Sequence, residues 1–232
     1  MMGVSVAVIV SCCNLHAYLD ACVESVKNQT MQPTELIIVH DGCKDSPPYP
    51  LYNIATNIVR NKNMGVARTR HEGVLISQSE HIIFLDADDC LDEYFIEAMI
   101  QTKAATKADI IYPNVLLWSN WSKEHPMKNA WHEAPDEVTW EKMMEYNQVV
   151  VSSLIPRVLY NAVGGFGNEP ILEDYAFFLR CMSGGYTFAK SKQSVLRYRQ
   201  RENGRNRRSH ELKNQWYYKI KSDYEKEEYE KS

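Results

Sequence analysis

Over its first hundred residues the chain alternates short, uniformly apolar runs with segments whose apolar residues recur at helical spacing. The runs 4–10, 36–39 and 82–85 are rich in Val, Ile and Leu and too short for helices. Such runs are typical of strands buried on both faces. The segments 15–26, 66–76 and 91–100 carry the helical pattern, and Asn14 is expected to cap the first helix. Alternating strands and helices predict an α/β fold, with a Rossmann-like, mostly parallel sheet covered by helices on both faces.

The pattern weakens after about residue 109. Strands are expected at 54–59, 110–118, 149–155 and 195–199, and helices at 141–146, 173–181 and, as a charged tail, 215–232. A length of 232 residues suits one domain with a small appendage. We predict a domain over 1–205, with a nucleotide-binding half at 1–110 and an acceptor-binding half at 111–205, followed by a helical tail at 206–232.

Charge and cysteine content exclude several classes of protein. The net charge of -4 argues against binding to nucleic acid through overall attraction to phosphates. The six cysteines form no C-x-x-C pair, and the adjacent Cys12 and Cys13 do not match a usual zinc clamp, so reduced thiols are expected. No basic leader and no apolar run of membrane-spanning length is present. The expected location is therefore the cytoplasm.

Carboxylates follow the strand at 82–85, at the edge where ligands of parallel sheets bind. In an extended chain Asp86 and Asp88 point to the same side. Two hard oxygen ligands at a strand end suit Mg²⁺ or Mn²⁺ that shares a substrate's phosphates. The alternative is structural, because Asp88 or Asp89 can equally cap the next helix.

Three further groups of polar residues each allow a functional and a structural interpretation. Asp41 follows another strand and should reach the same sheet edge, although Asp-Gly is also a common turn. Arg70 can neutralise phosphate or lie in solvent as a surface charge. Glu173 and Asp174 open a helix, where capping is the alternative to catalysis.

Four sequence blocks in this order resemble the inverting glycosyltransferases of family 2, which have the GT-A nucleotide-diphospho-sugar transferase fold. The blocks, which together extend over roughly residues 4–205, are VIVSCCN (8–14) with SVKNQT (25–30); ELIIVHDGC (35–43) with Asp45; NMG (63–65), ARTR (67–70) and Gly73 with FLDADD (84–89); and GGF (164–166), LEDY (172–175) and YR (198–199). One block alone is weak, whereas all four in sequence are specific.

The resemblance implies a metal-dependent transfer of a sugar from a nucleotide diphosphate, with UDP favoured as the commonest nucleotide in the family, to an acceptor hydroxyl. It implies that Asp174 is the catalytic base, that Asp88 and Asp86 meet Mn²⁺ or Mg²⁺, with Asp86 also on the ribose side, and that Asp41 contacts the base near Arg70. The other donor-binding positions that it implies are Ser11, Cys13, Ala87, Glu173, Arg199 and Arg201. The acceptor is expected to be a glycan, a lipid-linked molecule or a protein, in polysaccharide or glycoconjugate synthesis.

The chain departs from the family pattern at three positions. Cys13 stands where an aromatic residue often stacks on the base, His40 replaces a frequent aspartate, and Arg201 replaces a histidine that assists metal or phosphate. Arginine cannot ligate a cation but can hold a diphosphate. The arginines at 197, 199, 201, 205, 207 and 208 therefore form a phosphate clamp, a contact with the anionic inner face of a membrane, or a solvated basic surface.

Aromatic residues outside these blocks leave further alternatives open. Tryptophans 118, 121, 131 and 140 either stack on acceptor sugars or pack the smaller half of the domain, and the aromatic residues at 216–218 and 224 either dock the tail or form a homo-oligomer contact. A pyrophosphorylase or a dehydrogenase would need a glycine-rich phosphate loop, and Ser11 to Asn14 is not one. A catalytically silent domain that binds sugar or nucleotide, or serves as a structural partner, is the remaining alternative.

Overall fold

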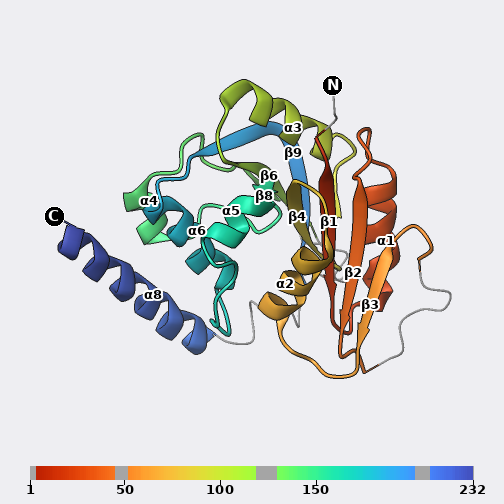
Figure 1. Ribbon diagram of the computed structural model, residues 1–232, viewed down its shortest axis with the longest axis horizontal. Coiled ribbons are helices and arrows are strands. Elements are labelled where there is room, and N and C mark those ends of the chain that lie inside the picture. Colours follow the sequence, from red (N-terminus) through yellow and green to blue (C-terminus); the bar gives the residue numbers. More distant parts are fainter. Residues whose placement is uncertain (1–3, 45–51, 119–129, 202–209, 232) are drawn as a thin grey trace.

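The computed structural model describes residues 4–44, 52–118, 130–201 and 210–231. Figure 1 shows an α/β arrangement in which strands occupy the centre and helices lie outside them. The strands of the described residues are β1 (Val6–Cys12), β2 (Glu35–Asp41), β3 (Thr56–Arg60), β4 (His81–Asp86), β5 (Cys90–Leu91), β6 (Ile110–Trp118), β7 (Ala130–His132), β8 (Ile155–Pro156) and β9 (Phe188–Arg199). The helices are α1 (His16–Lys27), α2 (Val66–Ile76), α3 (Phe95–Thr106), α4 (Trp140–Glu145), α5 (Arg157–Ala162), α6 (Glu173–Ser183) and α8 (His210–Lys231).

The larger sheet has the strand order β3-β2-β1-β4-β8. β1 pairs in parallel with both β2 and β4, and β2 pairs in parallel with β3, whereas β8 is antiparallel to β4. Every residue of β1 is buried, as its continuous apolar run predicts. The carboxyl ends of β1, β2 and β4 consequently lie together at one edge of the sheet.

Helices cover both faces of this sheet. Side chains of α1 and α3 pack with Val6, Val8 and Val10 on one face. Side chains of α2, α5 and α6 pack with Ala7 and Ile9 on the other. Alternation along β1 thus feeds two separate cores. α2 approaches β1 closely at Gly73, where an added Cβ would lie 2.3 Å from the Ile9 side chain.

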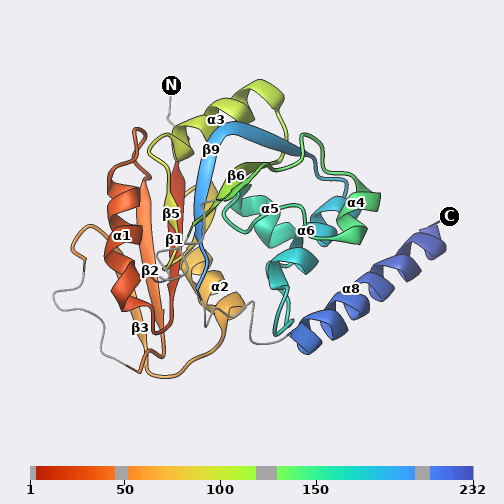
Figure 2. The ribbon, with the colours of Figure 1, turned by 180° about the vertical axis from the view of Figure 1, so that it is seen from behind.

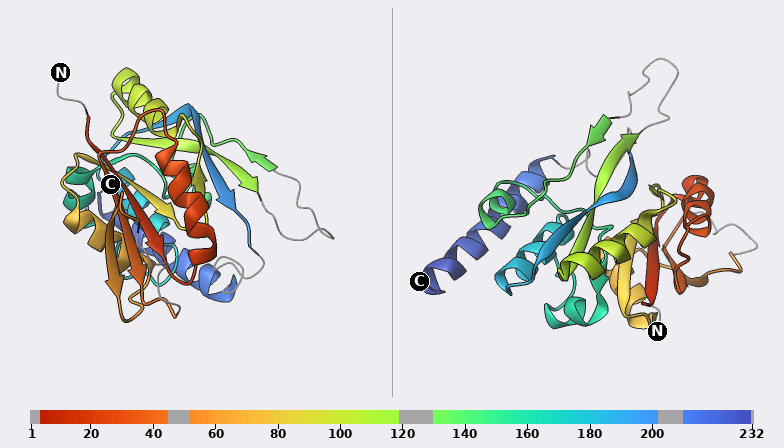
Figure 3. Two further views of the ribbon diagram at one scale, coloured as in Figure 1. Left: turned by 90° about the vertical axis from the view of Figure 1, so that its right-hand side faces the viewer. Right: turned by 90° about the horizontal axis from the view of Figure 1, so that it is seen from above.

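A smaller sheet of order β5-β9-β6-β7 adjoins the first. β6 and β9 pair in parallel, and the register shifts between Pro113 and Asn114. Figures 2 and 3 show β6 and β9 side by side, with α3 against them. β5 pairs with the end of β9, so the loop after β4 is tied to the second sheet.

Most of the predicted elements are present, and four expectations were wrong. The helix expected at 91–100 begins only at Phe95, because Cys90 and Leu91 pair with β9 as β5. The bounds expected for 66–76 and 110–118 match α2 and β6. The strand expected at 149–155 is reduced to the two residues of β8 and an isolated bridge at Leu154. Asn14 does not cap α1: it has a φ of 54°, and its side-chain oxygen accepts from the Lys44 N–H instead. The last strand begins at Phe188 rather than 195, because its first half is polar and gives little strand signal.

The helical tail docks on the domain rather than extending free. Ile220 and Tyr224 of α8 are buried in the same core as α6. The ring of Tyr217 stacks on Tyr175 at 5.5 Å, and its hydroxyl donates to the Met144 carbonyl. Tyr218 remains exposed. In Figure 1 α8 lies at the opposite end of the molecule from α1. Among the described residues, no helix combines the length and the apolar character needed to cross a bilayer.

Candidate active site at the strand ends

The carboxyl ends of β1 and β4 are joined through Ser11. Its hydroxyl donates to Asp86 Oδ1 at 2.8 Å, and the Ala87 N–H donates to its backbone carbonyl at 3.1 Å. The parallel register places Ser11 opposite Asp86. Three of the predicted donor-binding positions therefore lie together, because two strands that are far apart in the sequence are adjacent in the sheet.

Arg70 bridges the two halves of the candidate site. Its guanidinium contacts Asp86 at 2.7 Å and Glu173 at 2.7 Å, and lies over the Phe166 ring at 5.7 Å from the centroid. The Arg70 side chain is only 3% exposed, so the surface-charge interpretation was wrong. Glu173 is also buried, and its carboxylate accepts from Arg70. Arg70 thus fixes the end of β4 against the start of α6.

The carboxylates after β4 do not cap a helix. α3 begins at Phe95, and its N-cap residue Tyr94 makes no side-chain capping bond. Asp89 instead accepts from the Arg199 N–H at 2.7 Å, while Asp88 forms an ion pair with Arg201. The capping interpretation of this run was therefore wrong. The loop after β4 is held by the end of β9.

Arg199 is a second buried arginine at this site. Its Nε donates to the Asp88 carbonyl at 2.8 Å. Its guanidinium lies over the rings of Trp118, at 3.8 Å, and Tyr18, at 4.8 Å. Trp118 therefore packs on this arginine. Sequence reasoning did not assign Tyr18 to the site, and no motif marks it: a tyrosine on the amphipathic α1 reads as an ordinary helix residue.

Asp88 and Asp86 present the oxygen donors that Mg²⁺ or Mn²⁺ prefers. Burial and the neighbouring Asp86 raise the pKa of Asp88, and Arg201 opposes that shift. Among the described residues, no third His, Cys, Asp or Glu completes a metal-binding group with this pair. Two carboxylates fit a cation that completes its shell with water and phosphate oxygens. Arginines contact both carboxylates: Arg201 pairs with Asp88 and Arg70 with Asp86.

Asp41 lies at the end of β2 and is 2% exposed. Its carboxylate accepts from the backbone N–H groups of Met64, at 2.8 Å, and Gly65, at 3.0 Å, and pairs with Arg60 at 3.3 Å. Asp41 therefore organises the loop before α2. The Asn63 amide donates to the Asp41 carbonyl and to Cys13 Sγ, which brings the predicted base-binding residues together. Arg60 was not predicted, because nothing in the sequence pairs it with Asp41.

Asp174 lies one residue beyond the Arg70 bridge, in the first turn of α6. One of its oxygens accepts from the Tyr175 N–H at 2.9 Å, and the other accepts from the Asn147 amide at 3.3 Å. Burial, followed by the adjacent Glu173, raises the pKa of Asp174 to about 6. The residue before this helix, Leu172, has a φ of 64°, a conformation that leucine rarely adopts.

Several predicted residues cannot be placed. Asp45, Trp121 and the arginines at 205, 207 and 208 lie outside the described residues, so the proposed arginine clamp is visible only at Arg197, Arg199 and Arg201. Arg197 pairs with Asp92 at 2.6 Å. Of the other tryptophans, Trp131 is exposed and Trp140 packs on Tyr224.

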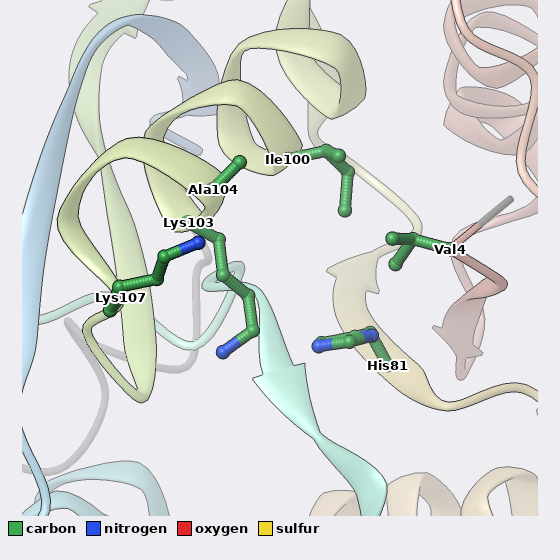
Figure 4. A pocket seen from close by; sticks show the side chains of 6 residues that line it. All are labelled: Val4, His81, Ile100, Lys103, Ala104 and Lys107. Atoms are coloured by element: carbon green, nitrogen blue, oxygen red, sulfur yellow. The ribbon is translucent and has the colours of Figure 1, made fainter. Parts of the chain in front are cut away.

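A pocket of about 250 Å³ lies elsewhere in the molecule. Figure 4 shows its lining residues: Val4, His81, Ile100, Lys103, Ala104 and Lys107. Val4 and His81 mark the amino ends of β1 and β4. Parallel sheets bind ligands at the opposite edge, so this pocket is separate from the candidate active site.

Solved structures share this fold. The crystal structure of Staphylococcus aureus TarS residues 1–349 superposes with a TM-score of 0.63 at 16% identity, covering 82% of this chain and 60% of that one. The same protein in complex with UDP gives a TM-score of 0.63 at 15% identity, covering 84% of this chain and 60% of that one. The fold is therefore the GT-A glycosyltransferase fold, as predicted.

Sequence comparison defines the family. The family model described as "Glycosyl transferase family 2" matches residues 7–152. The putative glycosyltransferase EpsH of Bacillus subtilis is 31% identical over 115 residues, which cover 47% of this chain and 33% of EpsH. The chain spans 31–40% of the length of the first curated relatives that it matches. The chain belongs to glycosyl transferase family 2.

Proposed function

We propose that this protein is a metal-dependent, inverting glycosyltransferase that moves a sugar from a nucleotide diphosphate, UDP in our proposal, to an acceptor hydroxyl. One observation carries the proposal: the buried Arg70 bonds both to Asp86, on the candidate metal-binding loop, and to Glu173, the neighbour of the candidate base Asp174. Arg70 thus connects the candidate metal-binding residue, which would lie beside the leaving diphosphate, with the candidate base, which would lie beside the acceptor hydroxyl. The UDP complex of the structurally similar TarS supports the choice of nucleotide.

Each residue then has a defined part in the reaction. Asp174 takes the proton of the acceptor hydroxyl while that oxygen attacks the anomeric carbon from the face opposite the diphosphate. Asp86 and Asp88 would hold the Mn²⁺ or Mg²⁺ ion, which offsets the negative charge on the leaving diphosphate. Arg201 releases Asp88 and holds the diphosphate instead, since its guanidinium matches phosphate geometry. Asp41 and Cys13 lie on the side of the site that receives the base.

Thermal unfolding tests donor binding directly. UDP with Mn²⁺ is expected to raise the melting temperature, because a ligand at 100 times its Kd stabilises the folded state by about 2.7 kcal/mol. For a chain of this size that is roughly 5–10 °C. The Asp88→Ala variant should lose the Mn²⁺-dependent part of the shift. Asp92→Ala is the matched control, because Asp92 also pairs with an arginine, Arg197, but follows β5 and is not one of the proposed metal ligands.

Two outcomes would contradict this part of the proposal. If no nucleoside diphosphate stabilises the protein, with or without Mn²⁺, the result would favour the alternative of a catalytically silent domain. If the Asp88→Ala variant keeps the full Mn²⁺-dependent shift in melting temperature, Asp88 is not a metal ligand.

The rate of transfer should also depend on pH through Asp174. A general base acts in its ionised form, and the pKa of Asp174 is raised to about 6. We therefore expect kcat/KM to reach a plateau above about pH 7 and to fall about tenfold per pH unit below about pH 6. A pH profile of UDP release, recorded at constant ionic strength, measures this. A flat profile between pH 5 and pH 8 would exclude Asp174 as the titrating base.

A further inference from the structure

Four metal-ligating side chains converge beside the candidate active site. Cys12 ends β1, His16 begins α1, His40 lies near the end of β2 and Cys43 follows in the next turn. One ligand atom from each of the four lies within 4.8 Å of every other. The parallel register places Cys12 directly opposite His40. The sheet therefore assembles a Cys₂His₂ group whose members are spaced C-x₃-H and H-x₂-C in the sequence.

The hydrogen bonds around His40 fix the state of its ring. The Asn57 amide nitrogen donates to the carbonyls of Tyr52, at 3.0 Å, and Ala55, at 2.9 Å, so the Asn57 oxygen must face His40. That oxygen lies 3.5 Å from His40 Nε2 and can only accept. Nε2 therefore carries the proton, and Nδ1 presents a lone pair. An imidazole oriented in this way by an outer oxygen acceptor is typical of a metal ligand.

The lone pair of His40 is buried without a donor. His40 is 0% exposed, and its Nδ1 has no hydrogen-bond partner among the described residues. Nε2 of His16 is likewise buried and unpartnered within that part of the chain. The two rings lie 5.6 Å apart. Buried polar atoms are nearly always satisfied, so two orphaned nitrogens in one cluster indicate a missing ligand.

The two thiols complete the donor set. Cys12 is 1% exposed and Cys43 is half-buried, and neither is in a disulfide. The Asn14 N–H donates to Cys43 Sγ at 3.4 Å, and this sulfur lies 3.5 Å from the Cys12 carbonyl, so Cys43 is held against the end of β1. Asn14 adopts its left-handed conformation in the loop between Cys12 and His16. Asn14, which the sequence predicts as a helix cap, thus lies beside the cluster instead.

We propose that Cys12, His16, His40 and Cys43 bind a structural zinc ion. Two sulfurs and two imidazole nitrogens are the donors of a closed tetrahedral zinc site, and they suit neither Mg²⁺ nor Mn²⁺. Ideal Zn–S and Zn–N bonds place the donor atoms about 3.3–3.8 Å apart. Since the donor atoms lie within 4.8 Å of one another, the cluster needs a contraction of about 1.5 Å at most to reach that geometry. Four protein ligands leave no open position, so this ion stabilises structure rather than catalysing a reaction.

The proposed zinc site lies beside the residues that are proposed to bind the base. Asp41 lies between His40 and Cys43, and Cys13 follows Cys12. A zinc ion would therefore join β1, α1 and β2 at the point where the proposed base-binding residues project. The proposal does not depend on the proposed transferase activity, because zinc binding is measured without substrate.

Metal content and cobalt substitution test the proposal. The full chain, purified in reductant without chelator, should contain about one zinc ion per molecule by mass spectrometry. After exchange with Co²⁺ it should show thiolate-to-cobalt charge-transfer bands and the intense visible bands of tetrahedral cobalt. Oxygen ligands alone give neither, so the signal distinguishes this site from the one at Asp88.

Variants locate the ion. Cys43→Ser should lose the zinc and the cobalt spectrum, whereas Cys90→Ser, the same change at another half-buried cysteine, should keep both. Asp88→Ala should also keep both. Asn57→Leu removes the outer acceptor and should weaken Co²⁺ affinity about 10–100-fold without abolishing the spectrum. If the Cys43→Ser variant does not fold, the His16→Gln variant is used in its place, because His16 lies at the partly exposed start of α1.

The opposite results overturn the proposal. Reduced wild-type protein that contains no zinc and gives no charge-transfer band with Co²⁺ has no such site. A folded Cys43→Ser or His16→Gln variant with the wild-type spectrum places the ion elsewhere.

Discussion

Asp174→Asn is expected to lower the rate of sugar transfer by about 10²–10⁴-fold, the usual contribution of a general base, while leaving donor binding intact. Asparagine keeps the size of the side chain, and its one oxygen can still accept from the Tyr175 N–H, but it loses the contact with the donating Asn147 amide and cannot take a proton. The measurement is UDP release in the presence of a panel of acceptors. Thermal stabilisation by UDP and Mn²⁺ should match that of the wild type.

The control is Asp136→Asn, the same change at an exposed carboxylate whose partner is Lys190. It should transfer sugar at the wild-type rate. Full turnover by Asp174→Asn would remove this residue as the base. Loss of donor binding together with loss of transfer would show instead that Asp174 shapes the donor site.

Arg70→Met is expected to destabilise the protein by about 3–5 kcal/mol, because it takes the arginine away from a buried carboxylate. Glu173 is almost as buried as Arg70 itself, with side-chain exposures of 6% and 3%. For a protein of this length the loss corresponds to a fall in melting temperature of about 6–20 °C. Chemical denaturation measures the free energy of unfolding directly. Lysine offers no substitute, because one ammonium group does not span both carboxylates in a fork geometry.

A double variant separates charge from packing. Arg70→Met with Glu173→Gln removes both charges of the buried ion pair and should recover much of the lost stability, since an amide is cheaper to bury than a carboxylate that has lost its arginine. The double variant is still expected to bind the donor weakly, because Asp86 has lost its contact with Arg70. A single variant as stable as the wild type would show that the bridge contributes nothing to folding.

The sequence predicts the frame of this fold well because its strands are buried on both faces. Continuous apolar runs such as that of β1, and the helical spacing of α2, are local signals that tertiary contacts reinforce. The polar residues that follow the strands meet at one edge, as a parallel sheet requires. Ser11, Asp86 and Ala87 can therefore be grouped from the amino-acid sequence alone.

Pairing between distant side chains could not be predicted in the same way. Nothing near Arg70 in the sequence indicates that Glu173, over a hundred residues away, fills its other side. The proposed zinc cluster was missed for a related reason. Cysteine spacing was examined alone, whereas two of the four donors are histidines, His16 at the start of α1 and His40 in β2. The register of Cys12 with His40 is the signal that would have found it. The division into domains and the roles assigned to the site residues remain predictions.

Leu172 shows how the start of α6 is set. A leucine at a φ of 64° persists only where its surroundings hold it there, at about 1–3 kcal/mol relative to an ordinary conformation. Glycine would adopt the same angles with ease, yet it would also let the following turn sample other directions. The chain therefore keeps a strained leucine two residues before Asp174. Replacing Leu172 by glycine would relieve the strain and raise the stability of the protein. The same change would make the turn before α6 less rigid and the position of the Asp174 carboxylate less well defined.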